Sequence, residues 1–94
     1  MAEDHVCVAL RVTGRVQGVS YRVWAAERGR ALGLSGWVRN RDDGAVEACL
    51  EGPAGAIAEM RAALAEGPPA ARVESVEETG RPPGCDAAGM EIRR

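Results

Sequence analysis

The segment from Gly14 to Arg22, with the sequence GRVQGVSYR, combines residue types that suit anion binding. Glycine permits positive φ and close backbone approach, and a loop that leads into a helix turns several amide N–H groups toward one point. The positive end of the helix dipole adds to the attraction for negative charge. Arg22 would lie in the first helical turn, where its planar guanidinium suits two phosphoryl oxygens. The segment therefore predicts a phosphate cradle, with a plain structural turn as the alternative.

Asn40 is the second candidate for chemistry. It ends the run GWVRN, directly before the turn RDDG. Its carboxamide has one acceptor oxygen and two donor hydrogens, so it can hold a water molecule without acting as a base. An asparagine before a turn is by itself ordinary turn chemistry. Its expected proximity to the glycine loop is what makes it a candidate for positioning water.

Apolar periodicity predicts the elements that must position these two groups. Alternating side chains predict a strand over 6–13, and strong helix formers predict a helix over 21–33. The runs SGWVRN and AVEACLEG predict two strands that the turn RDDG joins into a hairpin. Gly29, inside the first helix, costs about 1 kcal/mol relative to alanine and indicates close contact between helix and sheet.

The second half of the chain repeats this alternation of helix and strand. Apolar residues at helical spacing follow the dipeptide GP and stop before EGPP, which predicts an amphipathic helix. ARVESVEET predicts a fourth strand, in which Val73 and Val76 flank a bulge. The tail GMEIRR predicts a short edge strand with Met90 and Ile92 facing inward.

The resulting order is the ferredoxin-like βαββαβ plan, an α+β two-layer sandwich whose antiparallel sheet carries both helices on one face. A right-handed crossover makes the first and second strands parallel, with the third strand between them. The loop after Thr13 and the strand end that carries Asn40 should then lie at the same edge of the sheet. With 94 residues, the chain has the length of one domain, 1–94.

Composition excludes several classes of protein. The chain is 46% hydrophobic and 28% charged, as in ordinary globular proteins. Its net charge of −2 argues against general nucleic-acid binding, and its tryptophans suit the core or rim better than base stacking. Neither a signal peptide nor an apolar run of membrane-spanning length is present. We therefore expect a cytoplasmic monomer without a nucleic-acid or membrane partner.

The chain has one histidine, His5, and three widely spaced cysteines: Cys7, Cys49 and Cys85. These are too few ligands for a zinc site, so we expect no metal and no cofactor. Aligning the first and third strands with His5 opposite Glu51 puts Cys7 opposite Cys49. A disulfide between them is geometrically possible, but a reducing cytoplasm favours free thiols.

Rival hydrolytic chemistries lack their residues. A cysteine phosphatase loop needs an arginine six positions after its cysteine, and here those positions hold Thr13, Gly55 and Glu91. An aspartyl-phosphate enzyme needs a nucleophilic aspartate at the end of a strand. Asp42 and Asp43 instead lie in a hairpin turn, where solvent is the normal partner of a carboxylate. The single histidine stands near the N-terminus, away from any serine triad.

The segment VTGRVQGVSYR, followed by GWVRNRDDGAVEACLEG, resembles the two signature segments of the acylphosphatases. The resemblance spans nearly the whole chain, from Val6 to Arg94. It implies a metal-free hydrolase that cleaves acyl phosphates to a carboxylate and phosphate. In that family the arginine that matches Arg22 binds the phosphoryl group, and the asparagine that matches Asn40 orients the attacking water. The departures, such as Tyr21 where the family usually has phenylalanine, concern packing.

An acyl phosphate has a good leaving group, so its hydrolysis needs charge stabilisation and positioning more than a strong base. We expect Arg22 and the loop amides to hold the phosphoryl oxygens while Asn40 aligns water for in-line attack. Phosphate or sulfate should bind at the same place. The predicted phosphate-binding loop comprises Gly14, Arg15, Val16, Gln17, Gly18 and Val19.

Two other functions compete with this prediction. An acylphosphatase-like domain can bind a phosphorylated ligand without turnover, although a pure scaffold would not need both Arg22 and Asn40. An RNA-binding sheet is the weaker alternative and would show retention on RNA that falls steeply with salt. The sequence does not identify the physiological acyl phosphate.

Overall fold

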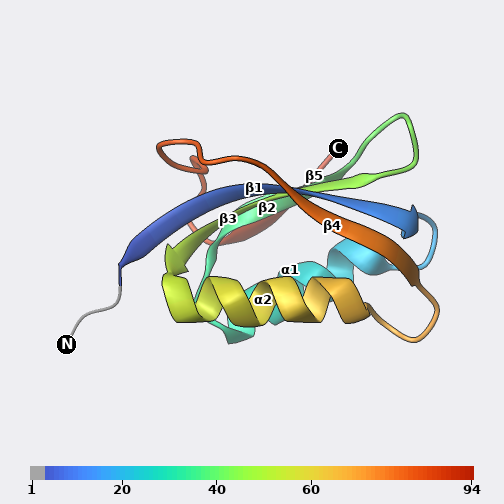
Figure 1. Cartoon of the computed structure of the whole chain (residues 1–94), viewed down its shortest axis with the longest axis horizontal. Helices are drawn as coiled ribbons and strands as arrows, with labels where there is room; N and C mark the ends of the chain where they lie inside the picture. Colours follow the sequence, from blue (N-terminus) through green and yellow to red (C-terminus); the bar gives the residue numbers. More distant parts are fainter. Residues whose placement is uncertain (1–3) are drawn as a thin grey trace.

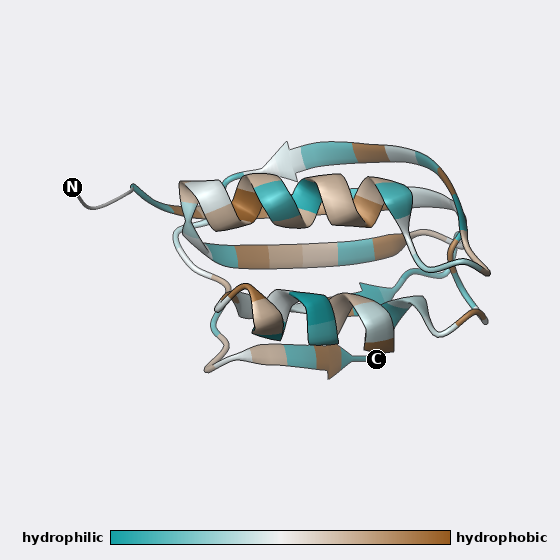
Figure 2. Cartoon of the chain, turned by 90° about the horizontal axis from the view of Figure 1, so that it is seen from below, coloured by the Kyte–Doolittle hydropathy of each residue, from teal (hydrophilic) through white to brown (hydrophobic). Residues whose placement is uncertain are grey.

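A computed structural model describes residues 4–94. One sheet has the strand order β4-β1-β3-β2-β5, and two helices lie side by side against one of its faces (Figures 1 and 2). This is the predicted ferredoxin-like arrangement, extended by a fifth strand at the edge. The elements are β1 (His5–Arg15), α1 (Tyr21–Ala31), β2 (Ser35–Asn40), β3 (Val46–Pro53), α2 (Ala54–Glu66), β4 (Arg72–Gly80) and β5 (Met90–Arg93).

The central strand β3 sets the geometry of the sheet. β1 and β2 each pair antiparallel with β3 from opposite sides, so they run parallel to one another. β5 pairs in parallel with β2 and forms one edge. The C-terminal ends of β1 and β2 therefore lie at the same end of the sheet. The connection that follows β1 is thus close to the end of β2, as the element order predicts.

β4 contains the predicted bulge. Thr13 and Gly14 of β1 pair with Ser75 and Val73 of β4, which leaves Glu74 without a partner on β1. The valines on either side of this bulge both pack against the core. The extra residue explains how two apolar residues three positions apart can face the same side of a strand.

The core lies between the sheet and the helices, and within residues 4–94 it buries no charged side chain. A Cβ atom at Gly29 would lie only 2.8 Å from Cγ of Met90, which confirms the close contact predicted between α1 and the sheet. Ile92, expected to face inward like Met90, is instead 43% exposed. No helix in the described part of the chain is long and apolar enough to cross a membrane.

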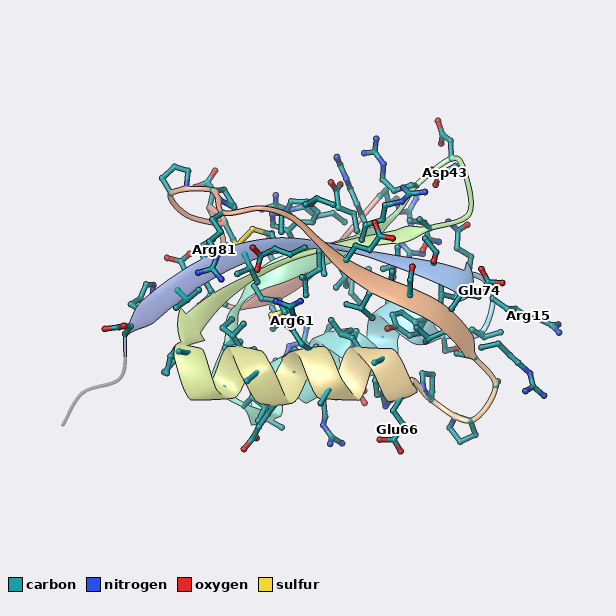
Figure 3. The ribbon with its side chains drawn as sticks, viewed as in Figure 1. Arg15, Asp43, Arg61, Glu66, Glu74 and Arg81 are labelled. Carbon is teal, nitrogen blue, oxygen red and sulfur yellow. A yellow bond between two sulfur atoms is a disulfide. The ribbon has the colours of Figure 1, made fainter. Side chains whose placement is uncertain are left out.

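The three cysteines meet on the face of the sheet that carries no helix. Cys49 of β3 forms a disulfide with Cys85, which lies in the connection between β4 and β5. Figure 3 shows this bond on the side of the sheet opposite α2. Cys7 of β1 keeps a free thiol, whose Sγ lies 3.1 Å from Sγ of Cys85. The expectation of three free thiols is therefore wrong for Cys49 and Cys85, and the bridge ties the chain before β5 to the centre of the sheet.

The predicted pairing of Cys7 with Cys49 is also wrong. Cys7 lies opposite Glu51, and Cys49 lies opposite Ala9, because β1 is shifted by two residues from the expected register. Alternation along a strand determines which face a side chain takes. It does not distinguish registers that differ by two residues, since both put the same side chains on the same faces.

Tyr21 joins α1 to the last turn of α2. The side chain is 1% exposed, and its hydroxyl donates a hydrogen bond of 2.7 Å to the carbonyl oxygen of Leu64. The last carbonyls of a helix have no partner within the helix, so this bond satisfies one of them. Burial raises the pKa of the Tyr21 phenol above its ordinary value of 10.0.

Replacing Tyr21 with phenylalanine should lower the free energy of unfolding at neutral pH by about 1–2 kcal/mol, because the buried carbonyl loses its donor. The difference should shrink above pH 10.0, where tyrosine ionises in the unfolded chain while the folded chain holds its proton. The unfolded state then binds fewer protons, and the wild type loses stability as the pH rises. Urea unfolding of both proteins at neutral and alkaline pH measures the effect.

Both proteins in this comparison should carry the substitution Cys7→Ala. It removes the thiol that could attack the disulfide at alkaline pH. Tyr21 is the only tyrosine of the chain, so no second phenol contributes. A stability difference that stays constant from neutral to alkaline pH would contradict the prediction.

Candidate active site

A pocket of about 390 Å³ opens at the sheet edge where β1 leads into α1 and where β2 ends. It brings together Arg22 and Asn40, which are distant in sequence, and three residues of the predicted loop. The topology inferred from the sequence thus brings Arg22 and Asn40 into one pocket with part of the predicted loop. The lining residues are Val16, Gln17, Gly18, Ser20, Tyr21, Arg22, Val23, Asn40 and Ile92.

The connection from β1 to α1 offers free amide groups to this pocket. Gly18 and Ser20 both adopt the left-handed conformation, with φ of 74° and 60°. Ser20 precedes α1, and its side chain makes no capping hydrogen bond. Within residues 4–94, none of the backbone N–H groups from 16 to 20 donates a hydrogen bond to a protein acceptor. Such a run of unpaired N–H groups ahead of a helix forms an anion-binding concavity.

The remaining predicted loop residues lie outside the pocket lining. Gly14 and Arg15 belong to β1 and pair with β4. A Cβ atom at Gly14 would collide with the carbonyl oxygen of Arg72, so this glycine is required by the sheet. Val19 packs against the core. The two glycines of the predicted loop therefore have different roles: Gly14 is required by sheet packing, and Gly18 by the loop conformation.

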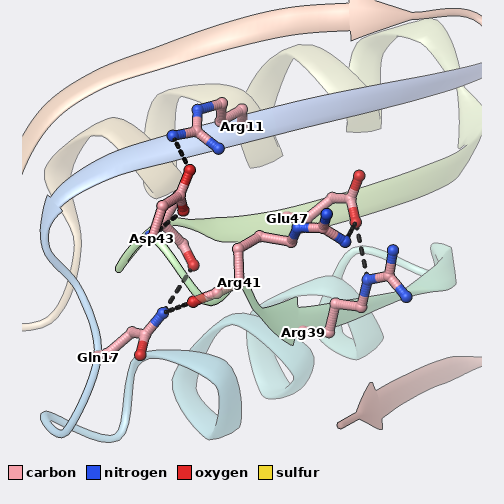
Figure 4. A network of polar contacts seen from close by, with 7 residues as sticks. Arg11, Gln17, Arg39, Arg41, Asp43 and Glu47 are labelled. Carbon is pink, nitrogen blue, oxygen red and sulfur yellow. Dashed lines mark hydrogen bonds and ion pairs between the residues drawn. The ribbon is translucent and has the colours of Figure 1, made fainter.

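Gln17 connects this loop to the turn between β2 and β3. Its Nε2 donates hydrogen bonds to the carbonyl oxygens of Arg41, at 2.8 Å, and Ala45, at 2.9 Å (Figure 4). The bridge fixes the loop relative to the chain that directly follows Asn40. Sequence reasoning missed this role, because the partners are backbone carbonyls and carry no side-chain signal.

Ion pairs on the helix-free face hold the same turn. Arg11 of β1 donates to Asp43 at 2.6 Å, and this hydrogen bond lowers the pKa of the Asp43 carboxyl. Arg39 and Arg41 both contact Glu47, at 2.8 and 3.4 Å (Figure 4). The charges of these three arginines are therefore compensated by neighbouring carboxylates.

Arg22 differs from these three paired arginines. It lies in the first turn of α1, partly exposed, and in the described part of the chain it forms no ion pair. Its Nη1 donates to the carbonyl oxygen of Arg93 at 3.0 Å, which anchors the guanidinium to β5. The other N–H groups and the positive charge stay available to a ligand in the pocket.

Asn40 ends β2, and its side chain presents a buried acceptor. Among the residues that the structure describes, its Oδ1 is the one buried side-chain oxygen or nitrogen without a hydrogen-bond partner. An unpartnered buried polar group costs about 1–3 kcal/mol and is rare in folded proteins. A water molecule in the pocket could satisfy this oxygen by donating a hydrogen bond to it.

The comparisons with known proteins agree with this geometry. A family model described as Acylphosphatase matches residues 8–92. The chain belongs to the acylphosphatase family. An acylphosphatase of Acidovorax sp. is 50% identical over 95 residues, covering 99% of this chain and 97% of the relative. One of Rubrobacter xylanophilus is 52% identical over 86 residues, covering 92% of this chain and 78% of the relative.

The solved structures support the same assignment. The structure of an acylphosphatase from Coxiella burnetii superposes with a TM-score of 0.88 at 32% identity, covering 96% of this chain and 94% of the other. The resemblance of the two signature segments, the ferredoxin-like fold and the enzyme class are thereby confirmed: the chain is an acylphosphatase. The roles of its individual site residues stay predictions.

Replacing Gln17 with alanine should lower kcat/KM for acetyl phosphate about tenfold, because the loop loses both hydrogen bonds to the turn. Gln17→Met keeps the volume of the side chain but has no donor, and it should show the same loss. Steady-state kinetics of both variants measures the effect. Wild-type kcat/KM in Gln17→Met would show that the bridge does not position the loop.

Proposed function

We propose that this acylphosphatase hydrolyses the carboxyl–phosphate bond of acyl phosphates by direct attack of water on phosphorus, without a metal ion. One observation carries the proposal. The unpartnered, buried Oδ1 of Asn40 shares a pocket with Arg22, a cation that no described carboxylate neutralises. An acceptor for water and a donor for phosphoryl oxygens are the two groups that this hydrolysis needs.

The phosphoryl group binds through its oxygens. The unpaired N–H groups between 16 and 20 donate to some of them, and Arg22 donates to others. These donors are fixed before the substrate arrives, since Arg93 anchors the guanidinium and Gln17 anchors the loop. Preorganised donors stabilise the charge on the equatorial oxygens of a phosphoryl transition state without reorganisation.

The attacking water donates one hydrogen bond to Oδ1 of Asn40, which turns its lone pair toward phosphorus. A new P–O bond forms, and the bond between phosphorus and the acyl oxygen breaks opposite to it. The carboxylate leaves with the electron pair of that bond, and the water's proton passes to a phosphoryl oxygen. No side chain has to act as a base, because the leaving carboxylate is weakly basic.

A monomeric state and a cytoplasmic location are parts of the same proposal. The residues that line the pocket come from a single copy of the chain, so a monomer would already carry all of them. The substrate class is doubly charged and crosses a bilayer poorly, which supports an enzyme in the compartment of its substrate. Inorganic phosphate or sulfate should bind at the loop in competition with the substrate.

Replacing Arg22 with alanine should lower kcat/KM for acetyl phosphate by about 10³-fold or more, because the phosphoryl oxygens lose a charged donor. Asn40→Ala should lower kcat by roughly 10²- to 10³-fold with little change in phosphate affinity, because it removes only the contact to water. Rates in excess chelator, together with calorimetric titration of phosphate, measure both effects.

Arg22→Lys and Asn40→Asp are the matched controls. Lysine keeps the charge but lacks the planar pair of donors, so it should recover only part of the activity. Aspartate keeps an acceptor near the water but adds charge that repels the phosphoryl group. Full activity of Asn40→Ala would contradict the water-positioning role. A wild type that binds phosphate but leaves acetyl phosphate intact would instead favour the non-catalytic binding module.

A further inference from the structure

The apolar rim of the active-site pocket singles out the acyl half of the substrate. In the described part of the chain, Val23 and Ile92 are the only exposed large hydrophobic residues, at 50% and 43%. Both line the same pocket as Arg22 and Asn40. One belongs to α1 and the other to β5, so their meeting here does not follow from sequence proximity.

We infer that Val23 and Ile92 form a binding subsite for the acyl group, which makes the enzyme selective for acyl phosphates with an apolar aliphatic or aromatic acyl group. This inference rests on the proposed function. The phosphoryl group takes the amides and the guanidinium. The acyl group, bonded to it through one oxygen, then extends toward the part of the pocket that offers no charge.

Folding alone does not account for these two residues. Valine is a poorer helix former than alanine by several tenths of a kcal/mol, and an exposed position in the first turn gains nothing from it. An exposed isoleucine on an edge strand invites edge-to-edge pairing, which proteins ordinarily suppress with charged residues. Residues that break local rules without a structural gain are typical of functional sites.

The pocket also has room for an acyl group. Small-molecule sites range from roughly 300 to 1,000 Å³, and the volume of about 390 Å³ here lies at the lower end of that range. A small apolar group therefore fits beside the phosphoryl group. Half-exposed valine and isoleucine side chains gain most from an uncharged partner that displaces water from them.

An anionic acyl group would find different neighbours. Arg39, Arg41, Asp42 and Arg94 line a separate pocket, which shares only Asn40 with the first one. Arg41 is already within 3.4 Å of Glu47, and Asp42 repels a second negative charge. The cations of that pocket are therefore partly compensated, and the rim that shares a pocket with Arg22 is the apolar one.

The test compares kcat/KM for acetyl and butanoyl phosphate in the wild type and in the double variant Val23→Thr/Ile92→Thr. Threonine keeps a β-branched shape; it replaces a methyl group of Val23 and the ethyl group of Ile92 with a hydroxyl. We expect a wild-type preference for butanoyl phosphate of about tenfold, below the larger ratios of fully enclosing pockets. In the double variant the preference should fall to about twofold. Because the readout is a ratio, a loss of activity common to both substrates cancels.

Ala31→Thr, at an exposed position of α1 away from the pocket, is the control and should keep the wild-type ratio. Titration with inorganic phosphate confirms that the double variant retains a folded loop. A ratio that the double variant leaves unchanged would overturn the subsite, while acetyl phosphate hydrolysis would still support the proposed function. A preference for 4-carboxybenzoyl over benzoyl phosphate would also overturn it. No hydrolysis of any acyl phosphate by the wild type would remove the proposed function and the subsite together.

Discussion

The antiparallel pairing of β3 with strands on both sides is the constraint on which the site depends. It makes β1 and β2 parallel, so that the connection after β1 and the end of β2 reach the same sheet edge. Neither candidate group would function alone. An arginine at a helix start binds anions, and an asparagine at a strand end binds water. Their shared position at the ends of two parallel strands is what the proposed hydrolysis requires.

Three sets of contacts, within and beyond the two signature segments, make this arrangement rigid. The carbonyl oxygen of Arg93 anchors Arg22, so the C-terminal strand contributes to the active site although none of its charged side chains lines the pocket. The disulfide between Cys49 and Cys85 ties the connection before β5 to the centre of the sheet. Gln17 fixes the loop to the β2–β3 turn. The pocket is therefore supported by β5, by the disulfide-linked connection before β5, and by the bridge from Gln17 to the β2–β3 turn.

The topology of the sheet and the meeting of Arg22 and Asn40 could be predicted from the sequence, because the order of elements and the alternation of side chains determine the topology. Arg22 and Asn40 were expected to meet on that ground, and they share a pocket. The register of β1 against β3 could not be predicted, since a shift of two residues preserves both faces. Likewise, the disulfide partner of Cys49 lies in a connection without periodicity, and nothing in the sequence places that connection over the sheet.

The exposure of Ile92 shows the same limit at the site itself. Alternation assigns it to the face of Met90, but alternation does not show which residues of that face a helix covers, and Ile92 lines the open pocket.

The most direct test of the central claim is hydrolysis of acetyl phosphate in ¹⁸O-labelled water, with the products analysed by mass spectrometry. The account predicts the label in phosphate and none in acetate, because water held by Asn40 attacks phosphorus. Label in the acetate would show attack at the carbonyl carbon and would contradict the account.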